Sequence, residues 1–377
     1  MILYFILAVN LVTVIWNLYY KHHWYRDIAV WLRFEADALY AGEETSIYEV
    51  IDNPKRMPVP VLEVGFHTKK ELDFAQEDNA NISDYIYKRD IFAVLGRQRI
   101  TRKIPLKCTR RGYYEIKEAE LTTYSLLYKK RLSRELKSDA SIYVYPKMAN
   151  VSDIMPLCER MLGTLQCSKR LYEDPFAFRT IRNYTVNDPM KTVNWKASAK
   201  TGMLMVNTFD SVLSQKAMLF LDVGDTGILK YEGLVEESIA VTATLARRLL
   251  RQGIEVGFCF NGNTAAENSN RESGFAPTNE KGMLIRMEHM LAEYRLEDGV
   301  HSYESEFDKY PTREDMLLVF ITKNLNAGLL DVIRKRAGEN QTLVIYPVYR
   351  GEVSQEEISY IKNTGNVRVS VREVGRE

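Results

Sequence analysis

Residues 217–222, AMLFLD, are apolar until the final acid, which is typical of a strand buried within a sheet. An amphipathic helical pattern covers residues 234–250 and ends at the turn residues Gln252 and Gly253. A second apolar run, residues 254–260, follows immediately. This succession of strand, helix and strand predicts two parallel strands joined by a right-handed crossover.

The alternation of helices and strands continues to the C-terminus. We expect helices at residues 283–296 and 325–336, and strands at residues 316–322, 342–349 and 367–371. Residues 213–377 are therefore predicted to form an α/β domain, a doubly wound parallel sheet with flanking helices. This pattern resembles the von Willebrand factor A type domain.

The segment before this domain, residues 178–210, reads FRTIRNYTVNDPMKTVNWKASAKTGMLMVNTFD. Within seventeen residues it holds Arg182, Tyr184, Asp188, Pro189, Trp195, Lys196 and Ser198. The pattern resembles the signature of a bacterial family called domain of unknown function 58. That family usually has Arg-x-Tyr, Gly-Asp-Pro, Trp-Lys-x-Ser-Ala-Arg and a Gly-Leu pair. Asn187 stands where the family prefers Gly, and Lys200 stands where it prefers Arg.

The signature residues have two interpretations. In the structural one, Trp195 is a core anchor, Asp188 and Pro189 form a turn that starts a helix over residues 190–200, and Arg182 pairs with Asp188 in a buried ion pair that holds the segment to the sheet. In the functional one, Arg182, Tyr184, Lys196 and Ser198 present a polar face to a partner protein. We expect a buried Trp195 and an exposed Lys196.

Residues 28–147 alternate with a period of two, in short runs broken by Gly, Pro and Asn, as in residues 59–64 and 141–145. This pattern predicts an all-β domain, an antiparallel β-sandwich. Its Gly-Glu, Arg-Gly-x-Tyr and Val-Tyr-Pro landmarks are similar to those of the same family. Residues 148–212, which include a helical pattern after Pro146, are interpreted as a linker followed by the signature segment.

The N-terminal residues 1–20, MILYFILAVNLVTVIWNLYY, contain no charged side chain and in a helix rise about 30 Å, enough to cross a bilayer. A signal peptide is the alternative, but the basic start and small-residue cleavage site are absent. We interpret Tyr19, Tyr20 and Trp24 as an interfacial aromatic belt. Basic residues follow the helix, so we predict a single-pass anchor in the cell membrane with the bulk of the chain cytoplasmic.

The charge balance and cysteine usage exclude some classes of function. Fifty-one basic and fifty acidic side chains give a net charge of +1, so a nucleic-acid partner is not expected. The four cysteines are scattered, which suits a reducing compartment and opposes both a disulfide scaffold and a zinc site. The chain has no GxSxG, P-loop or HExxH motif, so we assign no catalytic residue.

The resemblance to A-type domains raises the question of a metal site. In such domains the first strand ends in Asp-x-Ser-x-Ser, whose oxygens bind Mg²⁺. Here Asp222 and Thr226 remain as candidate ligands, with Asp225 as a weaker third, and Gly224 replaces the first serine. Lys323 puts an ammonium where metal-binding members typically have a second acid. We therefore predict a degenerate metal-ion-dependent adhesion site without a cofactor, Mg²⁺ being the less favoured alternative. Asp222 would then cap the next helix or pair with Lys323.

Two functions remain open. The leading hypothesis is a membrane-anchored protein-interaction scaffold. The resemblance implies association with a MoxR-type AAA+ ATPase in the assembly of envelope or secreted complexes. The alternative is an enzyme of cell-envelope or polysaccharide metabolism that uses the cleft at the carboxyl ends of the sheet.

Overall fold

The protein was analysed as a computed structural model. It describes residues 2–74, 85–125, 130–169, 178–186, 188–209, 215–225, 231–263, 273–310, 312, 315–325, 327–338, 340–351 and 367–375. The chain divides into two compact units. The first comprises Met1–Lys147 with Glu288–Glu293, and the second comprises Met148–Met287 with Tyr294–Glu377.

The first unit contains two sheets that follow the N-terminal helix α1 (Ile2–His23). One sheet has the order β1-β3-β7-β5 and the other has the order β2-β9-β8-β4-β6. All pairs are antiparallel except β2 with β9, so the predicted antiparallel strands are confirmed. The strands are β1 (Ala29–Phe34), β2 (Ala38–Tyr40), β3 (Glu44–Asn53), β4 (Val59–Lys69), β5 (Leu72–Asp73), β6 (Tyr85–Val94), β7 (Gln98–Cys108), β8 (Gly112–Tyr124) and β9 (Arg131–Tyr145).

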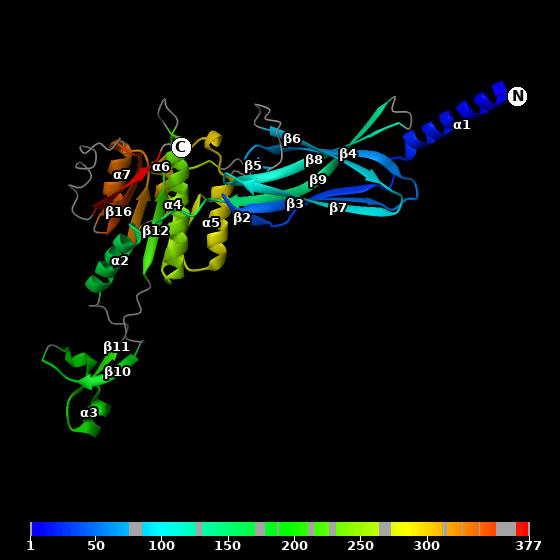
Figure 1. The fold of residues 1–377 in the computed structure, drawn as a ribbon. Coiled ribbons are helices and arrows are strands. Elements are labelled where there is room, and N and C mark those ends of the chain that lie inside the picture. The colour runs from blue at the N-terminus through cyan, green and yellow to red at the C-terminus, as the bar shows by residue number, and fades with distance from the viewer. Residues whose placement is uncertain are drawn as a thin grey trace. The chain divides into compact units, whose positions relative to one another are not determined.

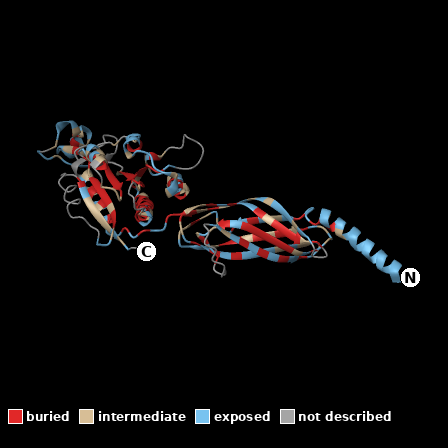
Figure 2. Cartoon of the chain, turned by 90° about the horizontal axis from the view of Figure 1, so that it is seen from above, coloured by how far each residue is buried: buried red, intermediate tan, exposed pale blue. Residues whose placement is uncertain are grey.

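The two sheets pack face to face around one apolar core. Leu32 and Ile47 from the first sheet lie in the same buried cluster as Phe66, Ile116 and Ile142 from the second. Figure 2 shows buried and exposed residues alternating along these strands, because successive side chains of a strand point to opposite faces. The alternation of buried and exposed positions explains why apolar residues recur with a period of two in the sequence.

The C-terminal end of α1 is part of the sandwich. The helix is long and apolar enough to cross a membrane, but Tyr20 and Trp24 are each only 2% exposed and pack in a second core cluster with Leu62 and Leu121. The hydroxyl of Tyr20 also lies 3.2 Å from the Thr123 hydroxyl. The expected aromatic belt is therefore wrong for Tyr20 and Trp24, whose rings complete the end of the sandwich core.

A charged layer interrupts the sandwich core. Glu49 of β3 lies between Ile47 and Ile51 on the inward face and is fully buried. Its carboxylate faces Asp90 of β6, which Arg102 of β7 contacts at 2.7 Å. Burial, and then the negative charge of Asp90, raises the pKa of Glu49 to about 8. The carboxyl group of Glu49 is therefore protonated in the folded protein at neutral pH.

This buried acid predicts that the first unit loses stability as the pH rises. Between about pH 4.5 and 8 the folded state holds a proton that the unfolded chain releases, so the free energy of unfolding falls across that window. In Glu49→Gln the free energy of unfolding should fall clearly less steeply with pH. Urea denaturation at a series of pH values measures this slope. The matched control, Glu44→Gln, changes an exposed acid of the same strand and should keep the original slope. Equal slopes in Glu49→Gln and the unaltered protein would contradict the assignment.

The second unit is built on a six-stranded sheet with the order β14-β13-β12-β15-β16-β17. All neighbours are parallel except β14, which runs antiparallel to β13 at one edge. From Met148 onward the elements are α2 (Met155–Lys169), β10 (Phe178–Asn183), a 3₁₀ helix (Met190–Thr192), α3 (Trp195–Thr201), β11 (Met205–Phe209), β12 (Lys216–Leu221), α4 (Glu232–Arg251), β13 (Glu255–Phe260), β14 (Gly274–Thr278), α5 (Lys281–Glu293), a 3₁₀ helix (Leu296–Asp298), α6 (Tyr303–Asp308), β15 (Met316–Ile321), α7 (Ala327–Ala337), β16 (Thr342–Tyr349) and β17 (Val367–Val374). All belong to this unit except the second half of α5, Glu288–Glu293, which is grouped with the first unit.

The predicted alternation of helices and parallel strands is confirmed, and the antiparallel edge strand β14 was not expected. Helix α4 packs against β12, β13 and β16 (Figure 1). Strand β12 pairs with β13 on one side and with β15 on the other. The winding of the chain therefore reverses at β12. In open α/β sheets such a reversal opens a crevice beyond the carboxyl ends of the strands, and Asp222 is the first residue there.

Candidate functional site

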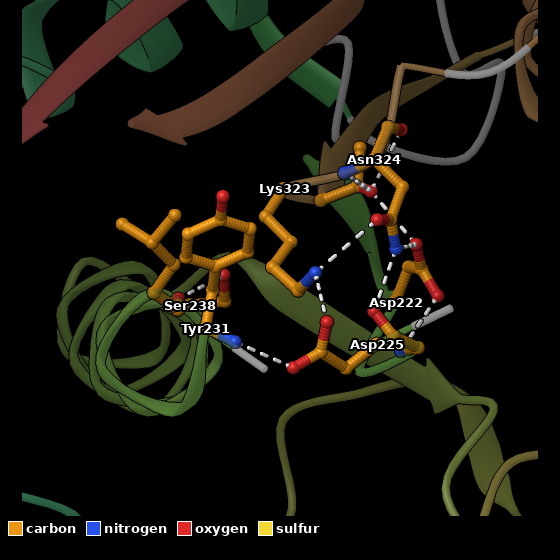
Figure 3. Close-up of polar contacts among 9 residues, drawn as sticks. Asp222, Asp225, Tyr231, Ser238, Lys323 and Asn324 are labelled. Carbon is orange, nitrogen blue, oxygen red and sulfur yellow. Dashed lines mark hydrogen bonds and ion pairs between the residues drawn. The ribbon is translucent and has the colours of Figure 1, made fainter. Parts of the chain in front are cut away.

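Asp222 is the centre of a polar network at the carboxyl ends of β12, β13 and β15. Its side chain is buried and lies beside that of Asn324 (Figure 3). Each carboxylate oxygen accepts two hydrogen bonds. Oδ1 accepts from the amide of Asn261 at 2.7 Å and from the backbone N–H of Gly224 at 3.0 Å. Oδ2 accepts from the hydroxyl of Thr322 at 2.8 Å and from the amide of Asn324 at 3.0 Å. These four bonds use the full accepting capacity of a carboxylate.

Lys323 supplies the positive charge of this site. Its side chain is only 5% exposed, and its ammonium lies 2.7 Å from Oδ1 of Asp225. Oδ2 of Asp225 accepts the backbone N–H of Tyr231, the residue before α4, at 2.7 Å. The ammonium also lies 5.5 Å from the centre of the Tyr231 ring. The expectation that Asp222 caps the next helix or pairs with Lys323 is therefore wrong, because Asp225 takes both contacts.

These residues do not fit a divalent metal. Every accepting position of the Asp222 carboxylate faces a hydrogen-bond donor, and a buried ammonium stands beside it on Asp225. A side chain at Gly224 would place its Cβ 3.0 Å from Oδ1 of Asp222, so the network leaves little room for a larger residue at this position. Thr226, the other candidate ligand, lies outside the described residues. Among the residues that the structure describes, no group of three metal-ligating side chains is found.

The geometry predicts that divalent metals leave the stability of the protein unchanged. A bound ion at a hundred times its dissociation constant would add about 2.7 kcal/mol to the free energy of unfolding. We expect the melting temperature to be the same with and without millimolar Mg²⁺ or Mn²⁺. A clear rise that Asp222→Asn abolishes would refute this prediction.

The Lys323–Asp225 pair should be important for folding. Removing one partner of a buried ion pair leaves the other charge without compensation, which costs about 3 to 5 kcal/mol. We expect Lys323→Met to lower the free energy of unfolding by about this amount in urea denaturation. The control Lys117→Met removes an ammonium whose side chain is 77% exposed, and it should cost less than about 1 kcal/mol. Similar small losses in both variants would mean that the pair is not structural.

The signature segment forms a small module of its own elements. Strands β10 and β11 pair antiparallel, and α3 lies between them in the chain. Asn194 caps α3 by accepting the N–H of Ala197 at 2.9 Å. The predicted helix over residues 190–200 is therefore a 3₁₀ turn followed by α3, which begins only at Trp195.

Two signature residues hold this module together from inside. The hydroxyl of Ser198 donates to the carbonyl of Asn194 at 2.9 Å and accepts the N–H of Met205 at 2.8 Å, which ties α3 to β11. Tyr184 is half-buried, and its N–H donates to the carbonyl of Leu204 at 2.9 Å. The Ser198 side chain therefore has a structural role, whereas the functional interpretation placed it on a partner-binding face; the bond of Tyr184 comes from its backbone, so its side chain stays a candidate for that face.

Arg182 and Asp188 form the predicted ion pair, with two parallel bonds of 2.7 and 2.6 Å. Asp188 also accepts the N–H and the hydroxyl of Thr185. The guanidinium of Arg182 and these bonds hold the pKa of the Asp188 carboxyl well below its usual range. The pair fastens the end of β10 to the turn that follows it, and the Arg182 side chain is 45% exposed. The expectation of a buried pair that holds the segment to the sheet is wrong.

Trp195 is 64% exposed, so its predicted role as a core anchor is wrong. Lys196 is exposed, as expected. The same module exposes further large apolar side chains, namely Ile181, Val186, Met190, Met203 and Leu204. Sequence reasoning missed these residues because they carry no motif. The module therefore exposes several large apolar side chains together with charged ones such as Lys196, which follows Trp195 in the chain.

No family model matches this chain. It is 22% identical over 339 residues to the "Uncharacterized protein YeaD" of Bacillus subtilis strain 168, covering 89% of this chain and 79% of the other. Two solved structures are similar to parts of it. The CARDB domain of the PF1109 protein from Pyrococcus furiosus has 14% identity and a TM-score of 0.20, covering 30% of this chain and 92% of its own. A cohesin module from Clostridium perfringens has 12% identity and a TM-score of 0.19, and the match covers 29% of this chain and 97% of the cohesin chain.

Proposed function

We propose that this chain is a membrane-anchored protein-interaction scaffold. In this proposal α1 is the anchor, the parallel sheet is a von Willebrand factor A-like domain without a metal, and the signature module carries the partner-binding face. The single observation that carries the proposal is the exposure of Trp195 together with five other large apolar side chains of the same small module. Exposed clusters of large apolar residues mark interaction sites, and tryptophan is enriched among the residues that dominate binding energy.

The anchor is supported by the way α1 meets the sandwich. Tyr20 and Trp24 belong to the sandwich core, so cleavage of the chain after the apolar run would remove core side chains from the folded domain. A retained helix is therefore favoured over a signal peptide. Lys21 and Arg26 follow the apolar run, and positive charge favours the cytoplasmic side. The proposed location is a single-pass protein of the cell membrane with its two folded units in the cytoplasm.

The proposed partner follows from the resemblance to the domain of unknown function 58 family. That resemblance supports a MoxR-type AAA+ ATPase, with a role in assembling envelope or secreted complexes. The alternative, an envelope or polysaccharide enzyme, receives no support from the Asp222 network. A buried carboxylate that already accepts four hydrogen bonds offers no free position for a general base.

The proposal predicts that Trp195 contributes to binding and little to folding. Trp195→Ala should change the free energy of unfolding by less than about 0.5 kcal/mol, because the ring is mostly in solvent. It should weaken partner binding by about 2 kcal/mol or more, roughly thirtyfold in Kd. The partner would be identified by co-purification from detergent extracts, and the Kd measured with the purified proteins.

Lys196→Ala is the companion variant and should weaken the same complex without loss of stability. Trp31→Ala is the control, because Trp31 is a 41% exposed tryptophan of the sandwich that lies outside the module. An unchanged Kd in both Trp195→Ala and Lys196→Ala would contradict the proposal that this part of the module binds the partner. If Trp195→Ala unfolds the protein, Trp195 has a structural role, and the proposed binding role would be contradicted.

A further inference from the structure

Several loops gather at the point where α1 meets the sandwich. The ammonium of Lys55 donates to the carbonyls of His23 and Arg26, each at 2.9 Å, and also to that of Trp24. The backbone N–H of Arg97 donates to the carbonyl of Lys55 at 2.8 Å. The end of the helix and the loops at residues 54–58 and 95–97 are thereby fixed to one another. These contacts, together with the buried rings of Tyr20 and Trp24, leave no flexible linker between the helix and the sandwich.

The loops present a basic surface, which we call the proximal face. It is formed by the exposed cations Arg26, Arg56 and Arg97 of the loops, with Lys21 of α1 and with Arg134 of β9, whose guanidinium lies 4.3 Å from the centre of the Tyr25 ring. Asp27 is the single acid within residues 24–28, 54–58 and 95–97, all of which the structure describes. Leu95 is 65% exposed and Tyr25 is 38% exposed on the same loops. The proximal face therefore combines an excess of positive charge with a few apolar side chains, in a protein whose net charge is only +1.

We propose that the proximal face binds the anionic phospholipid headgroups of the bilayer that α1 crosses. This inference rests on the proposed anchor, and it adds a defined lipid-binding surface to it. The rigid junction holds the face at the end of the apolar helix, which is the depth of the headgroups. Basic residues at that depth attract anionic lipids, and the attraction fades within a Debye length. Leu95 and Tyr25 supply the apolar and amphipathic side chains that suit the headgroup boundary.

The position of the face favours lipid over a protein or nucleic-acid partner. A partner protein would have to enter the space between the sandwich and the bilayer, which the absence of a linker keeps narrow. A nucleic acid would meet the same obstacle and the negative charge of the lipid surface. Lipid headgroups are already present there at high concentration. The sandwich is accordingly held against the membrane, and its orientation depends on lipid charge.

The test uses the full-length protein in nanodiscs of phosphatidylcholine alone or with added phosphatidylglycerol. Hydrogen–deuterium exchange is followed in peptides that contain residues 54–58 and 95–97. We expect exchange to be about threefold slower or more with the anionic lipid. The difference should disappear in about 0.5 M salt. It should also disappear in the double variant Arg56→Glu with Arg97→Glu, whose fold is checked by circular dichroism.

The matched control is Lys107→Glu with Lys117→Glu. Lys107 lies at the opposite end of β7 from Arg97, roughly 30 Å away along the strand, and both lysines are exposed. This variant should keep the lipid-dependent protection. Equal exchange in both lipids, with the helix embedded in the bilayer, would overturn the inference but would not contradict the membrane anchor. A loss of the lipid-dependent protection in the control variant would have the same meaning. A chain that fails to enter nanodiscs would overturn the anchor and this inference together.

Discussion

The buried carboxylate of Asp222 is the group on which the organisation of the parallel sheet depends. A carboxylate removed from water is stable only when its accepting positions are filled. Here the donors come from the ends of three neighbouring strands, β12, β13 and β15, so satisfying one charge also fixes the three strand ends at the reversal of the sheet. The neighbouring Asp225 is neutralised by Lys323. Within the described residues, protein donors thus fill all four accepting positions of Asp222.

The sandwich handles its buried charges in two other ways. Among the described residues no cation lies at hydrogen-bond distance from Glu49. Glu49 keeps its proton because burial and the neighbouring Asp90 both disfavour a second negative charge. Lys55 is partly buried, and burial lowers its pKa to about 8. Its ammonium satisfies carbonyl groups at the end of α1 that have no partner within the helix. Glu49 is neutral in the folded protein, whereas the ammonium of Lys55 joins α1 to the sandwich through its hydrogen bonds.

The signature module shows how a conspicuous motif divides its tasks. Arg182, Asp188 and Ser198 each bond to backbone or side chains within residues 178–209, so they stabilise a module that is defined by its own contacts. Trp195 and Lys196 lie on the outside of α3. The motif therefore contributes residues both to the inside and to the surface of the module, and its largest apolar residue, Trp195, is on the surface. This separation is why we place the binding function on Trp195 and the architectural function on its polar neighbours.

The sequence by itself determined the class of each unit and most of its helices and strands, although it missed the edge strand β14 and the late start of α3 at Trp195. The period of two in residues 28–147 and the apolar strands of residues 213–377 follow from which faces are buried, and burial is recorded locally in the order of the residues. The sequence also marked Asp222, Lys323 and the Arg182–Asp188 pair as special. The Arg182–Asp188 pairing was predicted correctly, but only the tertiary structure decided the partners of Asp222 and Lys323. It paired Lys323 with Asp225, buried Tyr20 and Trp24 in the sandwich, and left Trp195 in solvent. Pairings of this kind depend on residues that are distant in the chain, such as Asp225 and Lys323, and no local pattern records which of them will meet.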